Sequence, residues 1–97
     1  MTKLIWSPQA EQDIKAIRAY IIEDSTRYAE LVVGRIVAGV ERLARFPESG
    51  RIVPERNDPF IREVIVDPYR VVYRYRGSVV EIATVFRASR SFPARLG

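Results

Sequence analysis

The chain contains neither cysteine nor histidine among its 97 residues. Without cysteine there is no disulfide framework, no thiolate metal site and no cysteine nucleophile. Without histidine, the usual general base at neutral pH and the commonest metal ligand are missing. These absences exclude several classes of enzyme, so we expect no cofactor and no metal ion. The lack of cysteine also fits a protein of the reducing cytosol.

Long apolar runs and glycine-rich loops are missing as well. The chain begins MTKLIWSPQAEQD, where polar residues interrupt the apolar ones before a secretory core could form, and no later run approaches membrane-spanning length. There is no glycine-rich phosphate loop and no carboxylate spacing of a metal-binding loop. We therefore expect a cytoplasmic protein that has no membrane association and no small-molecule substrate.

The length and composition are typical of one folded domain over residues 1–97. A chain of 97 residues is too short for two ordinary cores, and its 47% hydrophobic and 29% charged residues can form one. The net charge of +4 comes from the second half, where nine arginines stand against five acidic residues between positions 50 and 97. Since arginine makes bidentate contacts with phosphate and carboxylate, this half predicts an anionic partner.

The first half has the periodicity of two helices. A short strand over residues 2–6 leads into Ser7-Pro8, a strong helix start, and Asp24-Ser25-Thr26 offers caps for a second helix that stops before Pro47. The two apolar stripes comprise Ala10, Ile14, Ile17 and Ile21, and then Ala29, Val33, Ile36, Val37, Val40 and Ala44. Two amphipathic helices joined this tightly predict an antiparallel hairpin. Gly34 and Gly39 interrupt the second helix, which indicates a close approach of the helices, a contact with a partner, or simple tolerance.

The second half has the pattern of strands. Residues 46–59 contain three prolines and no sustained period, which predicts a loop. Residues 60–66, 69–76 and 79–86 are β-branched and aromatic runs parted by Asp67-Pro68 and Gly77-Ser78, which are suited to tight turns. The predicted fold class is α+β, with the order β-α-α-β-β-β and a helical hairpin packed on one face of a small, mainly antiparallel sheet.

Strand parity separates two kinds of side chain between residues 69 and 76. One face carries Tyr69, Val71, Tyr73 and Tyr75, and the other carries Arg70, Val72, Arg74 and Arg76. The tyrosines fit sheet core better than proton transfer, because a phenol titrates near pH ~10. The arginines fit either a solvated face or an anion site, and the anion site is favoured because alternate guanidinium groups repel one another unless an anion neutralises them.

Several residues follow as candidates for binding a partner. The basic candidates are Arg62, Arg70, Arg74, Arg76, Arg87 and Arg90. Ile22 and Leu31 fall outside the apolar stripes of their helices, which indicates a hydrophobic patch that a partner could cover. Glu55 and Asp58 lie in the proline-bounded loop and fit a solvated surface.

Taken together, the motifs resemble the ParE/RelE superfamily of toxins over nearly the whole chain. The helical half is similar at Trp6-Ser7-Pro8, Ala10, Asp13, Ala16-Ile17, Tyr20-Ile21, Leu43, Phe46-Pro47 and Gly50-Arg51. The sheet half is similar at Arg62-Glu63, in the block YRVVYR from Tyr69 to Arg74, and from Ile82 through Val85 to Arg90. The resemblance implies a type II toxin that forms a hetero-oligomer with a ParD-like antitoxin, usually encoded beside it.

Within the superfamily, the resemblance leaves two targets. ParE-like members inhibit DNA gyrase, whereas RelE-like members cleave messenger RNA on the ribosome. Ribonuclease members carry lysines where this chain has Ile61, Glu63 and Ile65, and a tyrosine soon after the terminal arginine, where it has Phe92, Pro93 and Ala94. Retained arginines without those groups favour anion binding over proton transfer, and hence a gyrase inhibitor without catalytic residues.

Two alternatives stay open. In a ribonuclease, Arg70 with Arg87 or Arg90 would stabilise the transition state of messenger cleavage. In a degenerate member, the chain would fold and bind its antitoxin without harming the cell. Induction without antitoxin separates the three, since the outcomes are arrest of replication, arrest of translation and no effect.

Overall fold

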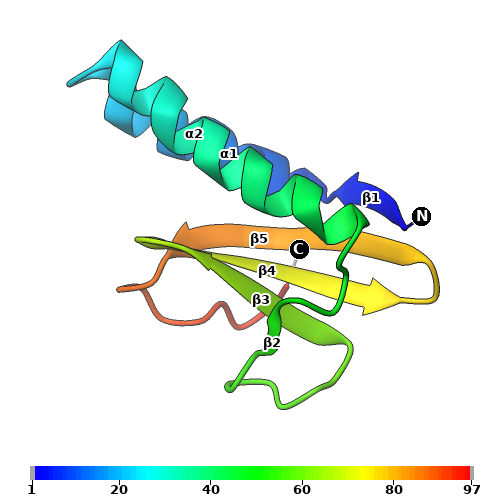
Figure 1. Cartoon of the computed structure of the whole chain (residues 1–97). Coiled ribbons are helices and arrows are strands. Elements are labelled where there is room, and N and C mark those ends of the chain that lie inside the picture. The colour runs from blue at the N-terminus through cyan, green and yellow to red at the C-terminus, as the bar shows by residue number, and fades with distance from the viewer. Residues whose placement is uncertain (1, 97) are drawn as a thin grey trace.

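The structure is a computed structural model that describes residues 2–96. In chain order its elements are β1 (Lys3–Trp6), α1 (Pro8–Ile22), α2 (Thr26–Glu41), a 3-10 turn (Arg42–Ala44), β2 (Arg51–Ile52), β3 (Ile61–Val66), β4 (Tyr69–Arg76) and β5 (Val79–Arg87). The five strands form one sheet in the order β1-β5-β4-β3-β2. Strand β1 runs parallel to β5, and the other neighbours are antiparallel. The α1–α2 hairpin covers one face of this sheet (Figure 1).

The predicted fold class is confirmed, with one correction in the loop. Strand β4 and both turns lie where the sequence predicted them, whereas β3 begins one residue later than predicted and β5 extends one residue further. Residues 46–59 were predicted as loop, but Arg51–Ile52 forms the short edge strand β2, which pairs with Glu63 and Arg62 on β3. Two residues have no detectable period, so only the neighbouring strand reveals this pairing.

Ser7 joins the start of α1 to the middle of the sheet. Its hydroxyl accepts a hydrogen bond from the backbone N–H of Ala10 at 3.0 Å, as expected of a helix cap. The same hydroxyl donates to the carbonyl of Ala83 on β5 at 2.8 Å, and the residue is buried. The predicted helix start is therefore confirmed, and it also anchors α1 against β5.

A bulge in β5 is held by a carboxylate from α1. Val72 pairs with Thr84 and Tyr73 pairs with Ile82, so Ala83 is the extra residue. Asp13 accepts hydrogen bonds from the hydroxyl of Thr84 at 2.6 Å and from the N–H of Val85 at 2.9 Å. A bulge leaves a backbone N–H without its hydrogen-bond partner on the neighbouring strand. Here the Asp13 carboxylate accepts the hydrogen bond of Val85 N–H, two residues after the bulged Ala83. Asp13 therefore fixes the docking of α1 on the sheet.

The hairpin packs through the predicted stripes with a small rotation in α2. Ala10 and Ile21 are buried in α1, with Ile14 and Ile17 packed against the core. In α2 the buried set is Ala29, Val32, Ile36 and Val40, so Val32 replaces the predicted Val33 at the centre of the face. A Cβ on Gly39 would lie 3.1 Å from Val66, so the close approach there is to strand β3 and not to the other helix, whereas one on Gly34 would meet nothing within 4 Å.

Buried clusters lie on both faces of the sheet, although the sequence predicted one on the hairpin side alone. Tyr69, Val71 and Tyr73 point into the core beneath the hairpin, as predicted. On the opposite face Val53, Val72 and Phe86 form a second buried cluster, against which Ile61, Phe92 and Leu96 pack. Figure 1 shows the chain after β5 turning back along this face. The face predicted to display a row of arginines is thus partly closed.

Candidate interaction surfaces

Arg70 is an internal residue, which corrects the prediction that it belongs to an exposed basic face. Its Nε donates to Glu63 at 2.6 Å, and its two terminal nitrogens donate to Glu55 at 2.9 and 2.8 Å. The Arg70 side chain is only 9% exposed and that of Glu63 is fully buried. Glu55, predicted to be a solvated loop residue, therefore closes a bidentate ion pair. The anion that neutralises Arg70 comes from the chain itself.

The electrostatics of this network follow from its geometry. The hydrogen bonds from Arg70 lower the pKa of Glu55 from 4.5 to about 2. In return, Glu55 first and Glu63 second raise the pKa of Arg70 above its ordinary value, against the effect of burial. Arg51 adds a second guanidinium to Glu63, with its Nε at 2.7 Å from Glu63 Oε2. The negative charge of Glu63 is thus balanced by Arg51 on β2 and Arg70 on β4.

Two aromatic rings enclose the same guanidinium. The Arg70 guanidinium carbon lies 5.3 Å from the ring centres of both Phe86 and Phe92. The two rings meet edge to face at 5.9 Å. Such contacts favour a cation and exclude water from it. Phe92, which stands near where ribonuclease members carry a tyrosine, thus serves here to cover Arg70.

Tyr73 is also committed to an internal role. Its hydroxyl donates to the carbonyl of Pro47 at 2.7 Å and accepts from the N–H of Gly50 at 3.1 Å. Burial raises the pKa of the Tyr73 phenol above its ordinary value. The interpretation of Tyr69 and Tyr73 as sheet core is confirmed by their burial. A phenol held in this way stabilises the segment before β2.

Arg62 is a second arginine that the fold engages. Its side chain is 18% exposed, and its terminal nitrogen donates to the carbonyl of Gly50 at 3.0 Å. Its Nε is buried and has no hydrogen-bond partner among the described residues. Arg62 was predicted to bind a partner, but its guanidinium is mostly buried and holds residues 48–50 against β3. Its role as a partner-binding residue stays a prediction.

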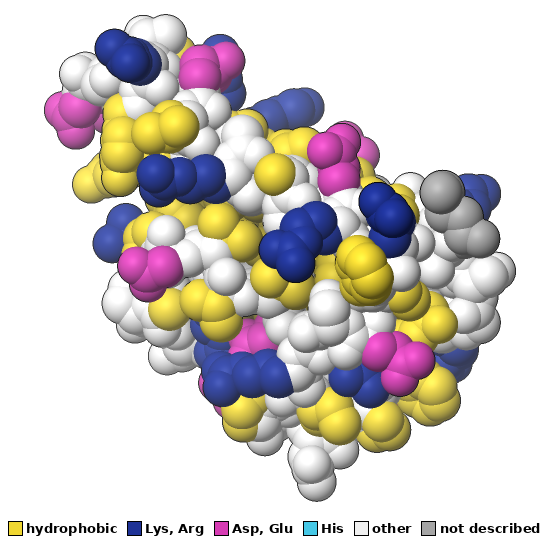
Figure 2. All heavy atoms as spheres, viewed as in Figure 1, with side chains coloured by type: hydrophobic (Ala, Val, Ile, Leu, Met, Phe, Trp, Pro, Cys, Tyr) yellow, Lys and Arg dark blue, Asp and Glu magenta, His cyan; other side chains and the backbone are white. Residues whose placement is uncertain are grey.

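The remaining basic candidates separate toward opposite ends of the sheet. Arg74 pairs with Glu81 at 3.1 Å, and Arg76 lies over the ring of Phe60 at 4.6 Å. Both line a shallow hollow of about 380 Å³ with Asp58, Phe60 and Val79. Arg87 pairs with Tyr69 at the other end of β4 and β5. On the face seen in Figure 2, basic side chains are spread over hairpin and sheet. Arg74 and Arg76 therefore keep the shared face that strand parity predicts, but the predicted row of arginines is reduced to these two because Arg70 is internal.

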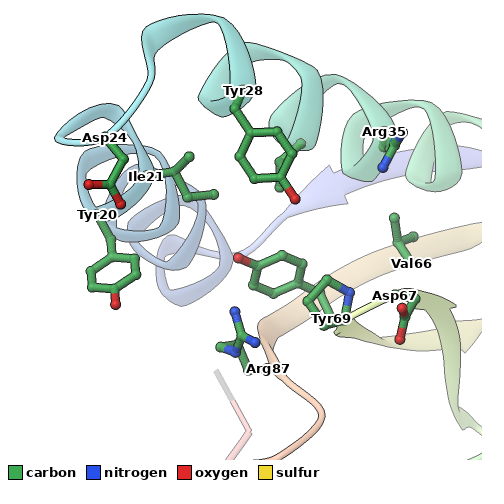
Figure 3. Close-up of a pocket in the computed structure, with 11 residues that line it drawn as sticks. Tyr20, Ile21, Asp24, Tyr28, Arg35, Val66, Asp67, Tyr69 and Arg87 are labelled. Atoms are coloured by element: carbon green, nitrogen blue, oxygen red, sulfur yellow. The ribbon is translucent and has the colours of Figure 1, made fainter.

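At the Arg87 end, side chains from the hairpin and the sheet surround a second hollow. Its lining includes Tyr20 and Ile21 of α1, Tyr28 and Arg35 of α2, and Tyr69 and Arg87 of the sheet. Figure 3 shows Tyr28 pointing from α2 toward Tyr69, with Arg87 beside Tyr69. The Arg87 guanidinium carbon lies 5.8 Å from the Tyr69 ring centre. Arg90 is exposed on the segment after β5.

The two hydrophobic candidates differ in their exposure to solvent. Leu31 is 50% exposed, which confirms that it lies outside the core stripe of α2. Ile22 is partly buried and packs against the main core, so its assignment to an exposed patch is wrong. The sequence interpretation missed Tyr20 and Tyr28, which are 73% and 52% exposed. The available signal was that two aromatic residues flank the interhelical turn without belonging to either stripe.

Two further findings concern metal ions and membranes. Within residues 2–96, nowhere do three or more Asp or Glu side chains gather in a way that could hold a metal ion. Over the same residues, neither helix combines the length and apolar character needed to cross a membrane. Among the described residues the geometry thus includes an internal ion network and the two hollows above, each with at least one arginine in its lining. A further hollow lies where Arg42 and Arg51 border Glu63, next to that ion network.

A two-helix hairpin on one face of a five-stranded mixed sheet places the protein in a class of small α+β domains. The known proteins that this chain resembles are toxins. The sequence model of the family described as "ParE toxin of type II toxin-antitoxin system, parDE" matches residues 4–92. The chain belongs to this family. It is a toxin of a type II toxin–antitoxin system, and its physiological partner is an antitoxin.

Individual relatives agree with this assignment. The chain is 32% identical over 91 residues to Toxin RelE2 of Caulobacter vibrioides, covering 93% of this chain and 99% of that protein. It is 37% identical over 92 residues to the protein Y4kP of Sinorhizobium fredii, covering 94% and 93% of the two chains. Its fold matches a chain of the chromosomal ParDE system from P. aeruginosa with a TM-score of 0.74 and 26% identity, covering 90% and 96%.

Proposed function

We propose that this toxin inhibits DNA gyrase in the cytoplasm by binding it, and that its antitoxin prevents this. The observation that carries the proposal is the state of Arg70, the arginine that the resemblance assigns to a ribonuclease site. Two carboxylates and two aromatic rings engage its guanidinium, and the phenol of Tyr73, on the other face of β4, donates a hydrogen bond to a carbonyl. Groups committed in this way support a binding mode of action over a proton-transfer one.

The hollow at the β4–β5 turn is the surface that we assign to gyrase. Phe60 is 46% exposed there, and Arg76 lies over its ring. An exposed aromatic residue with a neighbouring guanidinium is the combination enriched at the centres of protein interfaces. Arg74 and Glu81 border it and set its charge pattern.

The decisive experiment is a supercoiling assay with purified toxin and gyrase. Toxin alone should inhibit supercoiling in proportion to its concentration, and toxin first mixed with an equimolar amount of antitoxin should not. Full gyrase activity at a large excess of active toxin would refute the proposal. The toxin's activity is established in parallel by growth arrest on induction.

Ribosome-dependent messenger cleavage is the second candidate, because one relative bears the RelE name and because Arg87 lies beside the phenol of Tyr69. In that case Arg87 would stabilise the transition-state charge and a tyrosine of the hollow would move a proton. Primer extension on messages after induction separates the two. Cuts in phase with codons that disappear in Arg87→Ala would establish the ribonuclease and displace the gyrase proposal.

A further inference from the structure

The hollow at the projecting end of the hairpin has the size of a side-chain anchor. It measures about 180 Å³, below the range of ~300–1,000 Å³ typical of small-molecule pockets. Its walls come from the end of α1, the start of α2, the β3–β4 turn and the end of β5. Figure 3 shows that it opens between the hairpin and the sheet. A site of this size fits one or two side chains of a partner protein.

The charges around the hollow favour a single carboxylate over a polyanion. Arg35 and Arg87 line it and make no ion pair among the described residues. Asp24 and Asp67 line it as well, so two positive charges are matched by two negative ones. A nucleic-acid backbone would be repelled by the aspartates, since affinity for it grows with the number of neutralised phosphates. One acidic side chain directed at Arg87 avoids that repulsion.

An apolar surface lies beside the charged groups. Tyr20, Tyr28 and Leu31 are 73%, 52% and 50% exposed, and all three belong to the end of the hairpin near its turn. Figures 1 and 2 show that this end projects beyond the sheet and carries a gathering of hydrophobic side chains. Clustered apolar residues on a projecting surface mark interaction sites, whereas scattered ones do not.

We propose that this hollow anchors the antitoxin through one acidic side chain bound by Arg87, with a large apolar residue of the same segment packed on Tyr20 and Tyr28. The inference rests on the antitoxin partnership and not on gyrase as the target. Arg87 can present two parallel N–H groups to a carboxylate. The Tyr69 ring lies 5.8 Å from the Arg87 guanidinium carbon and favours its positive charge. Asp24 and Asp67 select against segments with several adjacent acids.

The test uses the antitoxin encoded beside the toxin gene and measures the dissociation constant of the complex by calorimetry. Arg87→Gln removes the proposed charge, and Arg27→Gln removes an equal charge from the same end of the hairpin without lining the hollow. Arg87→Gln should weaken binding by about 10- to 100-fold, the loss expected for a hydrogen-bonded charge pair. Arg27→Gln should change it less than about twofold. Both variants must keep the wild-type unfolding temperature.

A charge swap identifies the acid. Each Asp and Glu of the antitoxin is replaced in turn by Arg and measured against wild-type toxin and Arg87→Glu. Only one antitoxin variant should bind Arg87→Glu much more tightly than it binds wild-type toxin, and its substituted residue is the acid that contacts Arg87. Raising the salt concentration should weaken the wild-type complex more than the Arg87→Gln complex.

Three results would overturn the inference. The first is an equal loss of affinity in Arg87→Gln and Arg27→Gln. The second is loss of toxicity in Arg87→Gln with unchanged antitoxin affinity, which would assign the hollow to the cellular target. The third is the absence of any complex with wild-type toxin, which would remove the partnership itself. None of these measurements uses gyrase, so this inference and the gyrase proposal can fail independently of each other.

Discussion

Arg70 joins three segments of the chain through its guanidinium group. The residue itself lies on β4, its partner Glu63 lies on β3, and its partner Glu55 lies in the segment after β2. Glu63 is fully buried, so its charge depends on the guanidinium groups that compensate it. An interior carboxylate without such a partner carries the full cost of desolvation. The main consequence of changing Arg70 is therefore expected in stability.

We predict that Arg70→Gln lowers the free energy of unfolding by about 3 to 5 kcal/mol, because it leaves Glu63 buried with less compensation. Urea unfolding followed by circular dichroism measures this loss. Arg27→Gln, on the exposed face of α2, should stay within about 0.5 kcal/mol of wild type. If Arg70→Gln kept wild-type stability but lost partner binding, Arg70 would be a contact residue, as the sequence first indicated.

Glu55 predicts a pH dependence of stability. Its folded-state pKa is lowered from 4.5 to about 2 by the hydrogen bonds from Arg70. A lowered folded-state pKa contributes stability above the ordinary pKa, and that contribution disappears as the pH falls from 4.5 to about 2. Wild type should therefore be more stable than Glu55→Gln near neutral pH, and the difference should vanish over this window. Unfolding temperatures of the two proteins across the acid range test it, with Glu41→Gln as a control for general loss of charge.

Among the elements, the segment before β2 is the most tightly constrained. A Cβ on Gly50 would lie 2.6 Å from both the Glu63 carbonyl and the Tyr73 hydroxyl. The backbone of this segment is held by Tyr73 through Pro47 and Gly50, and by Arg62 through Gly50. Glycine at this point allows β2 to approach β3, which in turn brings Arg51 to Glu63.

A pair of glycine substitutions tests this packing. Gly50→Ala should destabilise the protein by about 1 to 3 kcal/mol, because the methyl group displaces backbone and the buried phenol. Gly34→Ala, in the open interior of α2, should stabilise it by about 0.5 to 1 kcal/mol through the lower backbone entropy of the unfolded chain. Denaturant midpoints of both variants measure the effects. Equal shifts in the same direction would contradict the close approach at Gly50.

For the whole molecule, the two hollows assigned to partners lie at opposite ends of β4. One contains Arg76 and Phe60 beside the β4–β5 turn, and the other contains Arg87 and Tyr69 beneath the hairpin turn. Surfaces separated in this way can bind different partners, and an antitoxin that spans the molecule could mask one while holding the other. If the two hollows have the partners proposed above, toxicity and neutralisation are expected to be separable by mutation.

We predict that Arg76→Glu raises the toxin concentration needed for half-inhibition of gyrase by about tenfold, the effect of disturbing one charged contact near an interface centre. The matched reversal Arg42→Glu, at the end of α2, should change it less than about twofold. Supercoiling assays across a toxin dilution series provide the measurement. Equal effects of the two reversals would mean that net charge, and not this surface, governs the interaction.

Local patterns in the sequence were sufficient for the helices, the long strands and their faces. Ser7-Pro8 predicts the start of α1, and alternation in β4 predicts that Tyr69 and Tyr73 enter the core, because both depend on residues only a few positions apart. The combination of motifs was also sufficient for the family. The helices and long strands agree with the prediction because the side chains that pack in the core recur at the helical or strand period of the sequence.

The environments of the arginines were decided by the tertiary structure alone. Glu55 reaches Arg70 across 15 positions, and Phe92 covers it from the segment after β5, so no local pattern shows that its charge is compensated. The pairing of β2 and the meeting of Tyr20 with Arg87 around one hollow likewise depend on segments far apart in the chain. Strand parity states which face a side chain takes, but what lies against that face depends on where distant segments pack.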